Sequence, residues 1–263
     1  MNLIRTPLGI AVQTPGDQLL LRHIIGVGMN YAAHAKEQGK GSPERPVLFT
    51  KNPMAACLSG DEIVIPKVCQ DREQVDFEGE LAVILRHPLD RPLRDIPKAE
   101  ALSCVLGYCC ANDVSARWWQ KEGAGGQFNR GKSFDTFCPL GPQVVASVQR
   151  EMAKPTSVLK SGMYDSGDSV KPIEDPASLR LVCRVNGQTM QDTPTSDMIF
   201  DVATLISEIT RGTTLLPGTV ILTGTPSGVG MARTPPVFLK HGDIVEVFIP
   251  GIGVLKNRVR VEK

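Results

Sequence analysis

Short apolar runs separated by glycine and proline follow one another along most of the 263-residue chain. Such runs are typical of β-strands, and we predict strands at 23–28, 46–51, 62–66, 79–85, 105–113, 179–187, 219–224, 243–251 and 253–262. Helical patterns are fewer, and we predict helices at 30–39, 96–104, 114–122 and 200–212, the last closed by Gly212. Strands and helices do not alternate regularly, so the pattern predicts a β-rich α+β fold and disfavours a doubly wound parallel sheet.

The domain organisation that this pattern predicts is simple. Residues 1–24 form a short N-terminal segment, and residues 25–263 form one catalytic domain. Residues 147–178 are polar and interrupted by proline, serine and glycine. We expect a long loop or insertion there rather than a domain boundary.

Composition and charge exclude several classes of protein. The net charge is +1 with both signs mixed along the chain, so we expect no nucleic-acid partner. No apolar run approaches the roughly 18 residues that a membrane span needs, so we expect no membrane partner. Seven cysteines without a CxxC pair indicate free thiols in a reducing compartment. We therefore predict a cytoplasmic protein; one arginine and no acid among the first sixteen residues leave a mitochondrial location as the alternative.

The segment Val75–Leu85, VDFEGELAVIL, combines an apolar strand with three acids. Successive strand side chains point to opposite faces, so Asp76, Glu78 and Glu80 are predicted to share one face. Neighbouring carboxylates raise one another's pKa, and a bound cation removes that penalty. The alternative is a polar, solvent-facing strand edge that binds nothing.

A second acid follows the apolar strand of GYCCANDVSARWWQ. If the residues after Asp113 are helical, Asp113, Arg117 and Gln120 lie at i, i+4 and i+7 and share one helix face. With Glu78 and Glu80, Asp113 would complete the set of oxygen ligands that a hard cation such as Mg²⁺ prefers. The alternative is structural, with Asp113 as a helix N-cap paired with Arg117.

Two further motifs carry side chains suited to proton transfer or to substrate contact. His34 and Glu37 lie at i and i+3 of a predicted helix, where the carboxylate would fix the tautomer of the imidazole and raise its basicity. Lys132 follows a glycine-rich loop, and the turn at 223–226 offers backbone amides and hydroxyls for a carboxylate. Alone, these features are also compatible with a surface helix pair and a solvated lysine.

As a set, six motifs resemble the fumarylacetoacetate hydrolase superfamily. They are GVGMNYAAHAKE, VDFEGELAVIL, LGYCCANDVSARWWQ, GKSFDTFCPLGP, TSDMIFDVATLISEI and PGTVILTGTPSGVG, in family order from about Gly26 onward. The segments KSFDTFCPLGP and RTPPVFLKHGD are most similar to the branch of fumarylacetoacetate hydrolase domain-containing protein 2.

The resemblance implies a mixed β-sandwich roll, a homodimer and a Mg²⁺ or Mn²⁺ cofactor. By motif position, it implies that Glu78, Glu80 and Asp113 are the metal ligands, and that Asp76 is a neighbour rather than a ligand. It further implies that His34 and Glu37 form a catalytic dyad. Lys132 and Gln120 would stabilise an oxyanion, and Arg117 and Thr225 would bind the substrate.

The resemblance also implies an enzyme that acts on small 2-oxo acids or β-diketones through an enolate that the metal stabilises. The first interpretation is hydrolysis of a C–C bond in acylpyruvate- or fumarylacetoacetate-like substrates. The alternative is keto–enol tautomerisation or decarboxylation of oxaloacetate in the same site. A second alternative is a non-catalytic metal-binding protein, because a fold alone does not determine function. Residue identity does not separate the three reactions.

Overall fold

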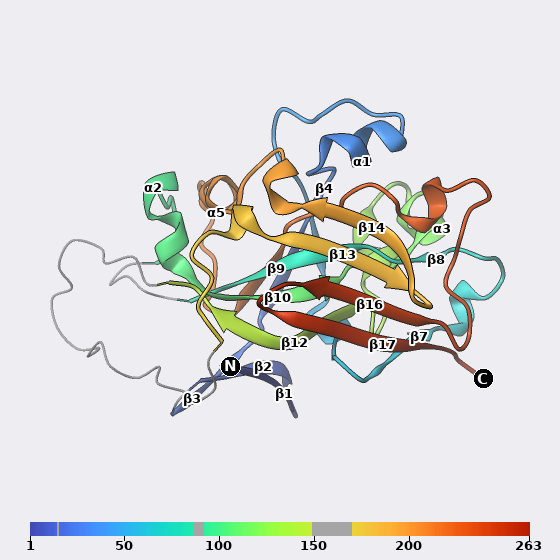
Figure 1. The fold of residues 1–263 in the computed structure, drawn as a ribbon, viewed down its shortest axis with the longest axis horizontal. Helices are drawn as coiled ribbons and strands as arrows, with labels where there is room; N and C mark the ends of the chain where they lie inside the picture. The colour runs from blue at the N-terminus through green and yellow to red at the C-terminus, as the bar shows by residue number, and fades with distance from the viewer. Residues whose placement is uncertain (15, 87–91, 149–169) are drawn as a thin grey trace, which may run out of the picture.

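Strands dominate the computed structural model, which describes residues 1–14, 16–86, 92–148 and 170–263 (Figure 1). Two large mixed sheets are stacked on each other, and short helices lie at their margins. The predicted β-rich α+β class is therefore confirmed. Among the described helices, none is long and apolar enough to cross a membrane.

The larger sheet contains seven strands and carries the site. Its spatial order is β5 (Val47–Lys51), β4 (His23–Gly28), β15 (Thr219–Leu222), β9 (Gly79–Leu85), β10 (Val105–Asn112), β12 (Cys138–Ala146) and β6 (Ala56–Leu58). The β4–β15 and β6–β12 pairs are parallel, and the other neighbours are antiparallel. Strands distant in sequence thus meet at the centre, where β9 lies between β15 and β10.

The second sheet has five strands and lies in front of β9 and β10 in the view of Figure 1. Its order is β14 (Gln188–Pro194), β13 (Arg180–Val185), β16 (Ile244–Ile249), β17 (Gly253–Val261) and β7 (Glu62–Ile65). Only the β7–β17 pair is parallel among these described strands.

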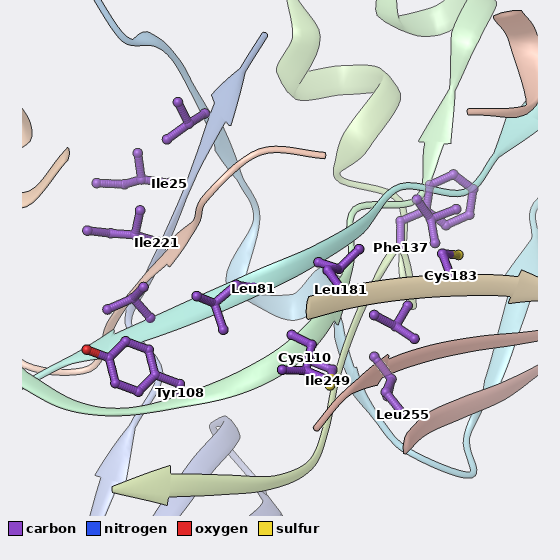
Figure 2. Packing of buried hydrophobic residues seen from close by; sticks show 14 of the residues in the cluster. Ile25, Leu81, Tyr108, Cys110, Phe137, Leu181, Cys183, Ile221, Ile249 and Leu255 are labelled. Atoms are coloured by element: carbon purple, nitrogen blue, oxygen red, sulfur yellow. The ribbon is translucent and has the colours of Figure 1, made fainter. Parts of the chain in front are cut away.

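Strand β9 is buried on both faces. Leu81 packs between the two sheets with Ile249 of β16 and Leu255 of β17 (Figure 2), and all three are at most 1% exposed. Ala82 and Ile84 point to the other face and join a second apolar cluster. Burial on both sides explains the continuous apolar run of this strand. It also excludes the solvent-facing edge as an explanation for the acids at its start.

The N-terminal segment forms a small antiparallel sheet, for which the sequence predicted no strands. It comprises β1 (Asn2–Thr6), β2 (Gly9–Thr14) and β3 (Asp17–Leu20). Ile10 and Val12 of β2 are buried in the second apolar cluster against Ile24 of β4. This small sheet therefore covers the face of the larger sheet that the five-stranded sheet leaves open.

The helices are short. They are α1 (Ala32–Glu37), α2 (Lys98–Ala101), α3 (Arg117–Gln120), α4 (Phe128–Lys132) and α5 (Val202–Thr210). Single 3-10 turns lie at Pro53–Ala55, Lys67–Cys69, Leu102–Cys104, Glu122–Ala124, Pro176–Ser178, Thr195–Asp197 and Gly230–Ala232. The predicted long helix is confirmed as α5, which begins after the N-cap Asp201 and is followed by Gly212 at φ 65°. Residues 149–169 of the loop predicted at 147–178 lie outside the described residues.

Candidate metal and active site

The acidic segment is not one continuous strand. β8 (Val75–Asp76) pairs with β11 (Ser115–Ala116), and the chain leaves the strand conformation at Phe77 and Glu78 before β9 begins. Within this break, the Glu78 N–H donates to Asn112 Oδ1 at 3.0 Å. The strand predicted at 79–85 is confirmed as β9, but the prediction that Asp76 shares one strand face with Glu78 and Glu80 is wrong, because the second short ladder separates Asp76 from the start of β9.

The structure nevertheless brings three predicted acids together. Ligand oxygens of Glu78, Glu80 and Asp113 all lie within 4.8 Å of one another. All three side chains are buried, and Asp113 directly follows the end of β10. Because three like charges in this space repel one another, their arrangement calls for compensating cations.

Two buried lysines supply part of that compensation. Lys132 Nζ donates to Glu78 Oε2 at 2.8 Å, to Asp113 Oδ2 at 2.5 Å and to Ser115 Oγ at 2.7 Å. Lys51 Nζ at the end of β5 donates to the other Asp113 oxygen. Sequence reasoning missed Lys51, although a lysine that closes an otherwise apolar strand was a usable signal.

Arg117 lies behind the carboxylates rather than among the pocket-lining residues. Its Nη1 pairs with Glu78 Oε1 at 2.7 Å and donates to Gln120 Oε1 at 3.0 Å. Its Nε and Nη2 both donate to Asp76. Asp113, Arg117 and Gln120 do not share a helix face as predicted, because Ser115 and the following residue pair in a strand and α3 begins only at Arg117.

Burial and charge shift the pKa values of these groups in different directions. Burial would raise the pKa of Glu78, but the cations of Lys132 and Arg117 outweigh it and hold that pKa below its usual range. Burial raises the pKa of Glu80 well above its usual range, and the carboxylates of Asp113 and Glu78 add to the effect. Burial opposes the charge of Lys132, yet Asp113 and Glu78 raise its pKa and keep it an ammonium.

Glu80 is the acid that lacks a cation partner among the described residues. Its Oε2 accepts a hydrogen bond from the Gly224 N–H at 2.7 Å, at the turn that follows β15. A buried carboxylate without a paired cation, next to two further carboxylates, suits a hard divalent cation with oxygen ligands. The residues present therefore fit Mg²⁺ or Mn²⁺.

The predicted dyad is in contact and faces the same space. His34 Nδ1 lies 2.6 Å from Glu37 Oε1, and Glu37 Oε2 accepts from the Gly228 N–H at 2.9 Å. This second bond ties α1 to the turn after β15. The other ring nitrogen, His34 Nε2, lies 2.8 Å from Gln38 Nε2.

A pocket connects His34 of the dyad with the carboxylates. Its lining includes the predicted residues His34, Glu78, Glu80, Gln120, Lys132 and Thr225, and also Val27, Gly28, Met29, Gln38, Lys40, Phe49 and Phe128. Asp113, Glu37 and Arg117 support this lining from behind. A base, an ammonium, an amide and a cluster of carboxylates thus converge on one cavity, which is the composition expected of a catalytic site.

Comparison with protein families identifies this arrangement. The model of the fumarylacetoacetate (FAA) hydrolase C-terminal family matches residues 23–260. The chain belongs to the fumarylacetoacetate hydrolase family. One relative, the mitochondrial oxaloacetate tautomerase FAHD2A of Bos taurus, is 41% identical over 236 residues, which are 90% of this chain and 66% of the relative. A fumarylacetoacetate hydrolase domain-containing protein 2 homolog of Dictyostelium discoideum is 37% identical over 90% of this chain and 71% of its own.

Solved structures of family members share the fold. The fumarylacetoacetate hydrolase of Exiguobacterium antarcticum superposes with a TM-score of 0.73 at 39% identity, covering 96% of this chain and 78% of that chain. The fumarylpyruvate hydrolase of Pseudomonas aeruginosa, solved with Mn²⁺ and pyruvate, has a TM-score of 0.77 at 25% identity and full coverage of both chains. The predicted family and fold are confirmed. The homodimer and the compartment stay predictions.

In this family member, Thr225 joins the pocket to the strand that carries Glu80. Its hydroxyl donates to the Gly79 carbonyl at 2.9 Å and accepts from Gln191 Nε2 at 2.7 Å. Gln191 in turn accepts from the Gly79 N–H at 2.9 Å. Sequence reasoning missed Gln191, because nothing in the pattern of β14 distinguishes it from its exposed neighbours.

Proposed function

We propose that this protein is a divalent-metal-dependent enzyme that interconverts the keto and enol forms of oxaloacetate. The observation that carries the proposal is one pocket whose lining brings His34 together with the buried acids Glu78 and Glu80. Proton transfer next to a polarised oxygen needs a base and a cation site, and this pocket offers both. The relatives named oxaloacetate tautomerase favour this reaction over the C–C hydrolysis expected first from the sequence. The chain spans 66% of their length, so their activity is a proposal here.

Glu78, Glu80 and Asp113 would hold the cation, Mg²⁺ or Mn²⁺. When bound, it supplies Lewis acidity that polarises the 2-oxo group of the substrate. The chain's own cations have a separate role: Lys132, Lys51 and Arg117 hold the carboxylates in place. Thr225 and the glycine-rich turn beside it would receive the substrate carboxylate.

His34 would move the proton. Enol-to-keto conversion takes one proton from the oxygen at C2 and adds one proton at C3, where the electron pair of the C2=C3 bond receives it. No water is consumed and no group leaves. With Glu37 accepting at Nδ1, His34 would present Nε2 to the substrate, where it would accept the first proton and return a proton to carbon. Lys132 and the Gln120 amide would stabilise negative charge on the substrate oxygen.

Hydrolysis of a C–C bond is the second candidate. The fumarylpyruvate hydrolase of similar fold was solved with Mn²⁺ and pyruvate, and the His34–Glu37 pair of this chain could activate a water. Enzyme with Mg²⁺ should be given enol-oxaloacetate and, separately, acetylpyruvate. Fast loss of enol absorbance with the keto form of oxaloacetate as the sole product supports the tautomerase. Pyruvate from oxaloacetate would indicate decarboxylation, and acetate plus pyruvate from acetylpyruvate would indicate the hydrolase.

A further inference from the structure

The side chain of Gln38 is placed against the base by the way α1 ends. Gln38 is the C-cap of this helix, and Gly39 follows in the left-handed conformation at φ 70°. The N–H groups of Gly39 and Lys40 bond back to helix carbonyls at 2.9 Å each, which is the Schellman arrangement. This ending leaves Gln38 one turn after His34, so their side chains meet on the same helix face.

The two partners of the imidazole determine where its proton lies. Glu37 contributes a carboxylate oxygen at Nδ1, 2.6 Å away, and a carboxylate only accepts. Gln38 contributes its amide nitrogen at Nε2, 2.8 Å away, and an amide nitrogen only donates. His34 is therefore the uncharged tautomer with its proton on Nδ1 and a lone pair on Nε2.

The two contacts of the ring also differ in what they require. Glu37 needs a proton on Nδ1, whereas the amide of Gln38 can donate only when Nε2 carries none. His34 is 3% exposed, so water does not replace the missing donor easily. Among the described residues, Gln38 is the hydrogen-bond donor that lies at His34 Nε2.

We propose that Gln38 is a positioning residue that holds His34 in the tautomer with its proton on Nδ1 and then releases Nε2 to the substrate. The inference rests on the proposed use of His34 as a base. Nε2 has one lone pair, so Gln38 must leave when the substrate proton arrives. Gln38 is half-buried, lines the pocket beside His34 and has a flexible side chain, so the exchange needs no movement of α1.

The first test is spectroscopic and needs neither metal nor substrate. The chain has four histidines, whose imidazoles are labelled with ¹⁵N. The signals of His34 are identified by their loss in the His34→Gln variant. Wild type should show one protonated and one unprotonated ring nitrogen near neutral pH. Gln38→Glu places acceptors at both nitrogens, so both should become protonated. Lys36→Met, an exposed change on the same helix, should keep the wild-type signals. Unchanged His34 signals in Gln38→Glu would overturn the proposal.

The second test separates positioning from general damage to the site. In enol-oxaloacetate turnover, Gln38→Glu should lower kcat by about 100-fold, the low end of what a base contributes, while KM changes by less than about threefold. Gln38→Met, which removes the donor without adding a charge, should lower kcat by about tenfold. Wild-type kcat in Gln38→Glu would contradict the proposal. If wild type itself does not turn over enol-oxaloacetate, the proposed reaction fails, and the ¹⁵N result still decides the role of Gln38.

Discussion

Arg117 donates two hydrogen bonds to a single carboxylate oxygen of Asp76, from Nε at 2.9 Å and from Nη2 at 2.7 Å. The other Asp76 oxygen accepts from the N–H groups of Phe77 and Gly230, both at 2.8 Å. The remaining guanidinium nitrogen pairs with Glu78. The resemblance treats Asp76 only as a neighbour of the metal ligands. The structure shows that Asp76 holds Arg117 in place, and that Arg117 in turn holds Glu78, a proposed metal ligand.

Asp76→Asn should therefore destabilise the protein and disturb the site together. The amide keeps the shape but removes the charge opposite Arg117, which is buried. Breaking a buried ion pair in this way typically costs about 3–5 kcal/mol, and urea unfolding of the metal-free protein should show a loss of this size. The Kd for Mg²⁺ should rise as well, because Glu78 loses a fixed partner.

Asp71→Asn is the matched control for that substitution. Asp71 pairs with Arg72 at 2.6 Å, but both side chains are about half exposed. Its loss should leave the unfolding midpoint and the Mg²⁺ affinity close to wild type. Equal behaviour of the two variants would show that the Asp76 pair has no structural role.

The raised pKa of Glu80 predicts a pH dependence for the metal-free protein. A carboxyl that binds its proton more tightly in the folded state stabilises that state at low pH, and this contribution is lost as pH rises through the folded pKa. Glu80→Gln mimics the protonated form, so it should be more stable than metal-free wild type at high pH. The difference should shrink as pH falls towards about 4.3, the ordinary pKa of Glu. Urea unfolding across this range measures it, and Glu44→Gln, at an exposed position, should follow wild type throughout.

Adding Mg²⁺ should make wild type more stable than Glu80→Gln. A ligand at 100 times its Kd stabilises the folded state by about 2.7 kcal/mol, and wild type should gain this amount. Glu80→Gln lacks one of three proposed ligands and should gain much less, and its metal-dependent activity should be lost. Thermal unfolding with and without Mg²⁺, and with a chelator, gives the comparison. A full gain in the variant would remove Glu80 from the ligand set.

Gly131 should be intolerant of even one added methyl group. A Cβ on Gly131 would lie 2.4 Å from the backbone nitrogen of Gln120 and 2.8 Å from the carbonyl of Ala116. Gly131→Ala would therefore push α4 away from α3 and carry Lys132 with it. Overpacking of this kind costs about 1–3 kcal/mol, and kcat/KM should fall together with the unfolding midpoint. Gly41→Ala, where nothing lies within 4 Å, is the control and should leave both unchanged.

The apolar pattern was sufficient to predict the central strands of both sheets and the longest helix. It could not predict β12, because Pro139, Gly141 and Pro142 interrupt the strand signal in CPLGPQVVA. The strands of the N-terminal sheet were not predicted, for a different reason. Its strands are short and partly exposed, so tertiary packing against Ile24, rather than local propensity, selects them.

The candidate site was predictable as a set of residues but not as a network. Motif positions placed Glu78, Glu80 and Asp113 together, and the structure agrees. Spacing alone could not show that Arg117 points at Asp76, because that contact depends on pairing between two-residue strands distant in sequence. Long-range contacts of this kind leave no periodic signal.

The two buried lysines on Asp113 offer the sharpest test of the site. Both are at most 1% exposed, and each donates to a different Asp113 oxygen. Only Lys132 also lines the pocket. Lys51→Met should therefore act mainly on stability, by about 3–5 kcal/mol for an interrupted buried pair, and at saturating Mg²⁺ it should keep kcat/KM within about tenfold of wild type.

Lys132→Met should lose stability to a similar degree and, in addition, lose kcat/KM by about 100-fold or more, as the removal of one oxyanion donor does. Both variants remove one cation from the Asp113 carboxylate, but only Lys132 also lines the pocket. Comparing them therefore separates support of the metal ligands from contact with the substrate. Steady-state kinetics with enol-oxaloacetate and urea unfolding of both variants provide the two readouts. Equal losses of kcat/KM would assign Lys132 to metal support alone, and the oxyanion role would then pass to Gln120, whose amide faces the same pocket.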